Sequence, residues 1–307
     1  MPLSADTLLD RVRLKSQIKR WQGIAIMLGI ILGFLSFSEM LGIAPGGSYI
    51  ARITIDGIIE EDQHRNERLE ALTKDDHVRA VIVAINSPGG TVVGGEDLYR
   101  ELKEVAKAKP TVTVMGTMAT SAAYMASLPA ERIFARDGTI TGSIGVLLQS
   151  AEVVDLAKKL GVDFVTIKSS PLKAIPSPTE KLTPEGRASI ESLIKDFYNV
   201  FVDMIVESRK MPREKVLEFA DGRIFTGRQA LSLKLIDEIG NEQQAVAWLK
   251  KEKGLSDSIE VHDYKTEKKP DEGFGAFLGG FMPFKRIFEK VSLQGLLSVY
   301  QDGIVTH

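Results

Sequence analysis

Two hydrophobic periodicities follow one another between residues 49 and 264. Short apolar runs with strand character lie at Tyr49–Asp56, Val78–Ile85, Thr111–Met115, Arg132–Ala135 and Asp163–Ile167. Amphipathic stretches with helical spacing lie at Gly94–Lys107, Ser121–Ser127, Val153–Leu160, Glu185–Arg209 and Gly227–Leu233. This alternation predicts one large α/β domain, because helices between strands can cover both faces of a sheet. The continuous apolar run Val81–Ile85 agrees, since a parallel strand buried on both faces has no polar side.

A different pattern precedes this domain. Arg20 and Glu39 bracket 18 residues without a charge, which as a helix would span roughly 27 Å, about the hydrocarbon core of a bilayer. Five basic residues against two acidic ones occupy residues 1–20, and this bias favours a cytoplasmic N-terminus. We therefore expect residues 21–43 to be an uncleaved transmembrane signal anchor, with the catalytic domain outside the cytoplasm. A cleaved signal peptide fits less well, because the run is long and no Ala-x-Ala site follows. A buried core helix also fits poorly, because the run is apolar on all faces.

Composition narrows the chemistry that this chain of 307 residues can perform. It has no cysteine, which excludes a thiol nucleophile, a thiolate metal site and any reliance on disulfides. The net charge of −2 and the pI near 6.2 argue against nucleic acid as the main partner.

Two unusual segments suggest acyl transfer. Ser121 lies in a small-residue stretch that follows a strand and begins a helix, where free backbone N–H groups favour developing negative charge. About thirty residues upstream, the paired glycines of Ile85–Gly90 let backbone N–H groups approach a substrate without a Cβ in the way. One segment thus offers a nucleophile and the other offers donors for an oxyanion.

A serine nucleophile needs a base, and histidine is an unattractive one here. The four histidines are His64, His77, His262 and His307, and none lies in a Gly- or Ser-rich loop typical of a site. A histidine triad stays open as the second choice. The other base that serves a serine nucleophile is a lysine that burial keeps neutral.

Lys173 is the best lysine candidate. The strand pattern Val162–Ile167 ends in a Pro- and Ser-rich loop, and the apolar residues Leu172, Ala174 and Ile175 flank the lysine. These neighbours favour its removal from water. The alternative is that Lys173 is an ordinary solvated surface charge, as most lysines are.

Several motifs, taken in order, resemble those of a known family. They are Asn86-Ser87-Pro88-Gly89-Gly90, Ser121-Ala122-Ala123-Tyr124, Thr141-Gly142-Ser143-Ile144-Gly145, Leu172-Lys173 and the stretch from Ala220 to Gly240. Together they resemble the signal peptide peptidase A family of Ser–Lys membrane peptidases. The resemblance runs from about Tyr49 to Tyr264 and implies a Clp-protease/crotonase-like fold.

The resemblance also assigns roles to residues. It implies that Ser121 is the nucleophile, that Lys173 is the general base, and that Ser143 orients the lysine amine. Gly89 and the backbone N–H of Ala122 would form the oxyanion hole. Alanine follows Ser121 here where many family members have glycine, which preserves the N–H provided that the turn needs no positive φ. For Ser143 a plain turn serine remains the alternative. The resemblance implies no metal, nucleotide or organic cofactor.

The length is similar to that of the short form of the family, with one catalytic domain per chain. That form implies a homo-oligomeric ring in which Ser121 of one protomer meets Lys173 of the next. The expected function is a membrane-anchored serine endopeptidase of the inner membrane that hydrolyses remnant signal peptides and other membrane-released peptides. The alternatives are a related Clp-fold protease that cleaves a specific membrane protein, and an inactive membrane scaffold, because fold alone proves no function.

The last part of the chain, residues 265–307, differs from the domain. A polar linker is followed by an apolar, aromatic-rich tail that Gly279-Gly280 and Pro283 interrupt, so that a second membrane span is not expected. The tail either packs on its own domain or a neighbouring protomer, or associates with the membrane surface or the ring interior. The expected organisation is thus a basic cytoplasmic N-terminus (1–20), a transmembrane signal anchor (21–43), a Ser–Lys peptidase domain (49–264) and a linker with an apolar tail (265–307).

Overall fold

A computed structural model describes residues 19–29, 47–265 and 297–299. The chain divides into two units between Gly47 and Ser48, and each is described by itself. In the first unit, residues 19–29 are helical. No helix within the described ranges is long and apolar enough to cross a membrane. Most of the predicted anchor, residues 30–43, lies outside these ranges, as do residues 1–18.

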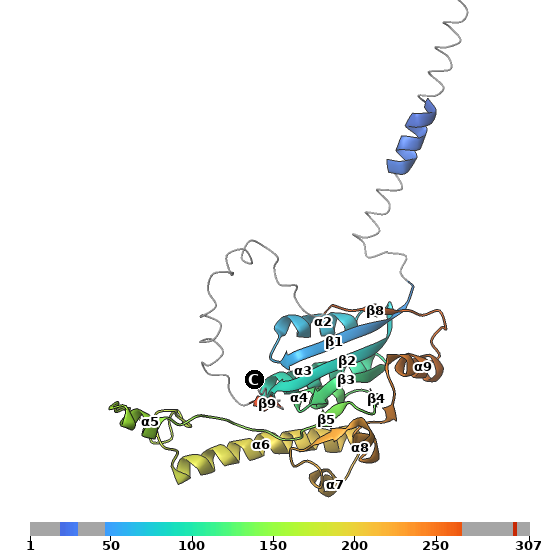
Figure 1. The fold of residues 1–307 in the computed structure, drawn as a ribbon. Coiled ribbons are helices and arrows are strands. Elements are labelled where there is room, and N and C mark those ends of the chain that lie inside the picture. The colour runs from blue at the N-terminus through green and yellow to red at the C-terminus, as the bar shows by residue number, and fades with distance from the viewer. Residues whose placement is uncertain (1–18, 30–46, 266–296, 300–307) are drawn as a thin grey trace, which may run out of the picture. The chain divides into compact units, whose positions relative to one another are not determined.

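A nine-stranded sheet organises the described part of the second unit (Figure 1). Its strands are β1 (Tyr49–Ile59), β2 (Val78–Thr91), β3 (Thr111–Thr120), β4 (Arg132–Ala135), β5 (Ile140–Gly142), β6 (Ile224–Thr226), β7 (Glu238–Ile239), β8 (Val261–Asp263) and β9 (Leu297–Val299). The main order is β6-β5-β3-β2-β1-β8, while β4 continues from β3 to β7. The pairs β5–β6 and β2–β9 are antiparallel and the others are parallel, so the predicted α/β class is confirmed with a mixed sheet.

Helices lie between these strands. They are α2 (Gln63–Thr73), α3 (Val92–Ala108), α4 (Ala122–Ser127), α5 (Val154–Lys159), α6 (Pro184–Arg209), α7 (Arg213–Leu217), α8 (Gly227–Ser232) and α9 (Glu242–Lys253). Local sequence fixes several of their starts. The Thr91 hydroxyl accepts from the Gly94 N–H at 2.9 Å at the start of α3, and the Thr183 hydroxyl accepts from the Gly186 N–H at 3.1 Å at the start of α6.

The sheet is buried on both faces. On β2, Val81, Val83 and Ile85 belong to the core formed with α2, α3, α4 and the C-terminal part of α6. Ala80 and Ile82 alternate with them and pack on the opposite face, where α9 contributes Ala245 and Leu249. This two-sided burial explains the continuous apolar run in the sequence.

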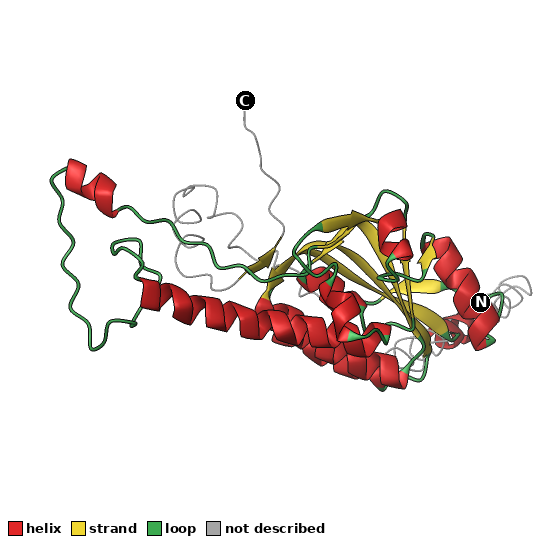
Figure 2. Ribbon diagram, turned by 90° about the horizontal axis from the view of Figure 1, so that it is seen from below, coloured by secondary structure: helices red, strands yellow, loops and turns green. Residues whose placement is uncertain are grey.

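One segment leaves this compact arrangement, and we call residues 147–193 the arm. It holds α5 and the first part of α6, and Figures 1 and 2 both show it extending away from the sheet. Val165 is 86% exposed and Ile167 is 95% exposed. The predicted strand Asp163–Ile167 is wrong, because the segment has strand-like residues but no neighbouring strand in the described chain with which to form a ladder.

Candidate active site

Ser121 lies at the junction between β3 and α4, as the sequence predicted. Its backbone has φ 57° and ψ −121°, a conformation that residues with a Cβ rarely adopt and that costs about 1–3 kcal/mol. The residue is 1% exposed, and its N–H donates to the Gly142 carbonyl at 2.9 Å. A buried, well-anchored junction therefore holds this serine in a strained geometry, as is common at functional sites.

The last part of β3 is tied to the glycine motif of β2 by side chains. The Thr120 hydroxyl donates to the Pro88 carbonyl at 2.9 Å. Asn86 Oδ1 accepts from the backbone N–H groups of Thr117 at 3.1 Å and Met118 at 3.3 Å. These bonds span the place where the β2–β3 register shifts after Ile85, and they hold the two loops next to each other.

The glycine loop requires its glycines. Gly89 has φ 110°, which is accessible to glycine at little cost. A Cβ on Gly90 would lie 1.7 Å from the Ile59 carbonyl oxygen, so β1 and β2 could not keep their spacing with any other residue there. The N–H of Gly89 donates to the Ser87 hydroxyl at 3.1 Å, and that hydroxyl is fully buried. The single N–H of Gly89, which the resemblance assigns to the oxyanion hole, is therefore held by Ser87 in this structure and has to leave that hydroxyl to bind an oxyanion.

The second predicted oxyanion donor, Ala122, is the first residue of α4 and is fully buried. A Cβ on Gly95 would come within 2.7 Å of the Ala122 Cβ, so α3 approaches α4 closely only because position 95 is glycine. Ala122 follows the positive-φ residue and is itself helical, so the turn does not require glycine at this position.

Tyr124 anchors α4 from within the core. Its hydroxyl donates to the Leu235 carbonyl at 2.9 Å, and burial raises its pKa well above the ordinary value near 10. Next to this contact, Arg209 at the end of α6 pairs with Asp237, with Nη2 and Oδ1 2.7 Å apart. Asp237 also accepts from the Ile133 N–H at 2.8 Å. The helix that follows Ser121 is thus fixed to α6 and to β4.

Ser143 is brought next to the Ser121 junction. It directly follows Gly142, the residue that accepts from the Ser121 N–H, and its own N–H donates to the Arg223 carbonyl at 2.8 Å. Ser143 also has a positive φ, of 50°. A hollow of about 410 Å³ begins beside it at Ile144 and extends to Asp221 and Gly222.

Lys173 is not brought to this junction within the chain. It lies on the arm with an exposed side chain, and its ammonium makes no hydrogen bond or ion pair with the described residues. The nearby Lys168 is different, because it is mostly buried and pairs with Glu180. The desolvation expected for Lys173 from its apolar neighbours is not present in the single chain, since Leu172 is itself 37% exposed.

The histidines within the described ranges offer no clear base. His77 precedes β2 and His262 lies on β8 against the start of β1, so both belong to the edge of the parallel strands opposite to Ser121. His262 stacks on Tyr49, with ring centroids 5.0 Å apart. His64 is exposed on α2. His307 lies outside the described residues.

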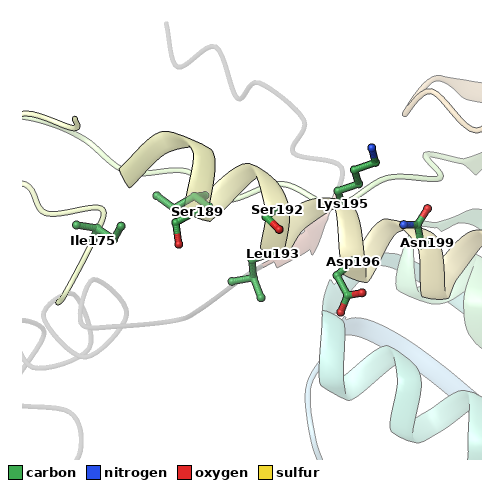
Figure 3. A pocket seen from close by; sticks show the side chains of 8 residues that line it. Ile175, Ser189, Ser192, Leu193, Lys195, Asp196 and Asn199 are labelled. Carbon is green, nitrogen blue, oxygen red and sulfur yellow. The ribbon is translucent and has the colours of Figure 1, made fainter. Parts of the chain in front are cut away.

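A second hollow runs from the arm along α6. Figure 3 shows this space of about 660 Å³ along α6, with Ile175 at the end near Ser189 and Asn199 at the other end. Ile175 is two residues beyond Lys173, but the lysine itself does not line this hollow. Within the described ranges, no group of three or more histidine, aspartate or glutamate residues is placed to hold a metal ion.

Comparison with known proteins identifies the family. The model of Peptidase family S49 matches residues 103–256, which include Ser121, Ser143 and Lys173. The chain belongs to peptidase family S49. It is therefore a serine peptidase, and the inferred resemblance to signal peptide peptidase A is confirmed.

Relatives of this S49 peptidase carry related names. A candidate protease of Synechocystis sp. is 40% identical over 71% of this chain and 80% of its own length. A candidate signal peptide peptidase, SppA, of Enterococcus faecium is 33% identical over 75% of this chain and 70% of its own. The chloroplastic serine protease SPPA of Arabidopsis thaliana is 29% identical over 94% of this chain and 43% of its own.

Two solved structures are also similar to this chain. A mutant of ClpP1 from Listeria monocytogenes has a TM-score of 0.42 at 16% identity, and covers 64% of this chain and 94% of that one. A mutant of the membrane-bound stomatin-specific protease 1510-N has a TM-score of 0.46 at 15% identity, and covers 71% of this chain and 98% of that one.

Three residues that hold the candidate site together were missed at the sequence level. Asn86 and Ser87 were noted only as part of a glycine motif, yet Asn86 binds the β3 backbone and Ser87 holds the Gly89 amide. Thr120 was not noted, although its hydroxyl bonds the end of β3 to the Pro88 carbonyl of β2. Polar residues at the ends of otherwise apolar strands were the signal that could have revealed these contacts, because a buried polar group needs a hydrogen-bond partner.

Proposed function

We propose that this serine peptidase is a membrane-anchored endopeptidase that hydrolyses remnant signal peptides, and that it has a Clp-protease/crotonase-like fold. The strained, buried Ser121 between the Ser87–Gly90 loop and Ser143 carries the proposal. The uncharged run after Arg20 supports a membrane anchor with the peptidase domain outside the cytoplasm. The name of the Enterococcus faecium relative supports the substrate class.

The proposed reaction uses Ser121 and Lys173 as nucleophile and base. Lys173 Nζ takes the proton of the Ser121 hydroxyl, whose oxygen attacks the peptide carbonyl, while the N–H groups of Gly89 and Ala122 stabilise the oxyanion. The lysine then passes the proton to the leaving amine, and an acyl-enzyme remains. A water that gives its proton to Lys173 hydrolyses this ester, and Ser143 orients the amine throughout.

We further infer that Lys173 comes from a neighbouring protomer. Within one chain Ser121 is buried in the domain, whereas Lys173 is exposed on the arm. A second copy that covers the arm would remove Lys173 from water and bring it to the first copy's Ser121. Repetition of this head-to-tail contact closes a ring when the rotation permits.

Active-site labelling tests the nucleophile. A fluorophosphonate probe should label the full-length protein at Ser121 and should not label Ser121→Ala. Ser150→Ala, which changes an exposed serine of the arm, should be labelled like the parent protein. Labelling of folded Ser121→Ala at the parent rate would reject Ser121.

Mixing two inactive variants tests the shared dyad. Ser121→Ala protomers still hold Lys173, and Lys173→Ala protomers still hold Ser121, so co-expression should restore peptidase activity at mixed interfaces. Each variant carries a different tag, and sequential pull-down isolates the mixed assemblies. If these assemblies form and remain inactive, the dyad is not shared.

Two further measurements test the cellular role. Fractionation of cells should recover the full chain with membranes, and protease added to the outside of spheroplasts should reach the domain. Synthetic signal peptides should be hydrolysed faster than polar peptides of equal length. Equal rates for both classes would contradict the proposed substrate.

A further inference from the structure

One peptide unit, between Pro88 and Gly89, is held at both of its polar ends. Its carbonyl oxygen, which belongs to Pro88, accepts from the Thr120 hydroxyl at 2.9 Å. Its N–H, which belongs to Gly89, donates to the Ser87 hydroxyl at 3.1 Å. Ser87 and Thr120 are both fully buried. Two hydroxyls that solvent does not reach therefore fix this unit in one orientation.

This orientation keeps the Gly89 N–H away from an oxyanion. A backbone amide has one hydrogen, and the bond to the buried Ser87 hydroxyl directs that hydrogen into the protein. A donor of an oxyanion hole has to point instead at the position that the oxygen of the reacting carbonyl occupies. The Gly89 N–H can therefore bind an oxyanion only after the peptide unit turns.

The backbone on both sides of the unit permits such a turn. Gly89 has φ 110°, and a half-turn of the peptide unit brings this angle to about −70°, which is also allowed. Glycine adopts both signs of φ readily. On the other side the turn changes ψ of Pro88, and the proline ring restricts only φ. Both orientations are thus open to the backbone, and the two hydroxyls select between them.

We propose that the Pro88–Gly89 peptide unit is a two-state switch of the oxyanion hole, and that Ser87 and Thr120 are positioning residues that hold it closed. This inference rests on the proposed peptidase function. Thr120 directly precedes Ser121, so a shift of the β3–α4 junction that withdraws the Thr120 hydroxyl also releases the Pro88 carbonyl. The proposed nucleophile and the proposed oxyanion donor therefore become competent together.

Loss of one holding bond should favour the open orientation. A neutral hydrogen bond of this kind changes an equilibrium by about twofold to tenfold. Thr120→Val and Ser87→Ala should each raise kcat by about the same factor. KM should stay within about twofold of the parent value, because the released N–H acts on the oxyanion and not on the bound peptide. A merely structural role of these hydroxyls would not raise kcat.

Substitutions of similar shape provide the controls. Thr120→Val removes the hydroxyl, whereas Thr120→Ser keeps it and should return kcat toward the parent value. Thr113→Val removes another buried hydroxyl of β3, which donates to the Ser127 carbonyl at 3.4 Å, and it should leave kcat unchanged. A kcat that rises in neither Thr120→Val nor Ser87→Ala would overturn the proposal.

Hydrogen exchange tests the switch without catalysis. In the Ser121→Ala background, the Gly89 amide should exchange about twofold to tenfold faster with Thr120→Val than with Thr113→Val, as resolved by single-residue fragmentation. Equal exchange would overturn the inference even if the enzyme is active. Faster exchange, together with a parent chain that fluorophosphonate does not label at Ser121, would instead reject the peptidase assignment and leave the hold on the peptide unit standing.

Discussion

The Ser121 junction and the arm with Lys173 are built in opposite ways. Ser121 is 1% exposed, and backbone and side-chain hydrogen bonds from Gly142, Asn86 and Thr120 fix the loops around it. The arm exposes most of its apolar residues, up to 95% at Ile167, and its only well-buried cation within the described part is Lys168, which pairs with Glu180. One chain is thus sufficient to position Ser121, the proposed nucleophile, whereas the arm has the composition of a surface that another molecule covers.

The largest expected effect is a loss of catalytic activity when either region loses its proposed catalytic residue. Ser121→Ala and Lys173→Ala should each lower kcat by about 10⁴-fold or more, and the double variant should be no worse, because the residues act as one unit. Lys173→Ala should leave the melting temperature unchanged, since its ammonium makes no contact within the described chain. Peptide hydrolysis and thermal unfolding measure the two quantities.

The matched control is Lys159→Ala, which removes another exposed lysine of the arm. Lys168→Ala is a poorer control, since it also breaks the pair with Glu180. Substantial hydrolysis by Lys173→Ala would reject the lysine as base and return attention to the histidines.

Two positions on α6 should show the contrast in stability. Phe201 is fully buried in the domain, so Phe201→Ala should lower the free energy of unfolding by about 3–5 kcal/mol. Leu193 on the arm is 43% exposed, so Leu193→Ala should cost less than about 1 kcal/mol in the single chain. Denaturant unfolding gives both values.

The Leu193 variant also sharpens the interpretation of the arm. If a second copy covers this face, Leu193→Ala should weaken assembly, as seen by ultracentrifugation at falling concentration. The contrast would be contradicted if Leu193→Ala left assembly unchanged and if the Phe201 and Leu193 variants lost equal stability. The two halves of α6 would then be equally buried in the single chain.

Glycines provide a third comparison. Gly90→Ala should lower the free energy of unfolding by about 3 kcal/mol or more, because its Cβ would overlap the Ile59 carbonyl and force β1 and β2 apart. Gly161 on the arm has φ 75° but open space around it, so Gly161→Ala should cost only about 1 kcal/mol of backbone strain. Chemical denaturation measures both, and similar losses would contradict the tight packing at Gly90.

The smallest effect concerns Tyr124 and pH. Tyr124→Phe leaves the Leu235 carbonyl without its donor and should cost about 1–3 kcal/mol at neutral pH. The folded-state pKa of Tyr124 is raised, so its contribution is fully present below pH 10 and is lost as the pH rises through the folded value. The stability difference between parent and variant should therefore narrow above pH 10.

Unfolding followed from pH 8 to pH 11 measures this difference, and the other tyrosines cancel because both proteins contain them. A constant difference over this range would show that Tyr124 titrates normally and is not held neutral by burial.

Local sequence patterns were sufficient to predict most strands and helices of the domain and a candidate nucleophile. Apolar periodicity located β1, β2 and β3, because these strands are buried on both faces and leave a strong local signal. The motif around Ser121 predicted a serine at a strand–helix junction, and family membership agrees with it. The glycine pair predicted a close backbone approach, which Gly90 against Ile59 provides.

Features that depend on partners distant in sequence could not be predicted from local patterns. Residues Asp163–Ile167 have strand propensity, but a strand requires a neighbour, and periodicity does not report one. The exposure of Lys173, the hold of Ser87 on the Gly89 amide and the pairing of Leu297–Val299 with β2 are likewise set by contacts across the fold. Local sequence encodes propensity and burial, whereas these features depend on which surfaces folding brings together.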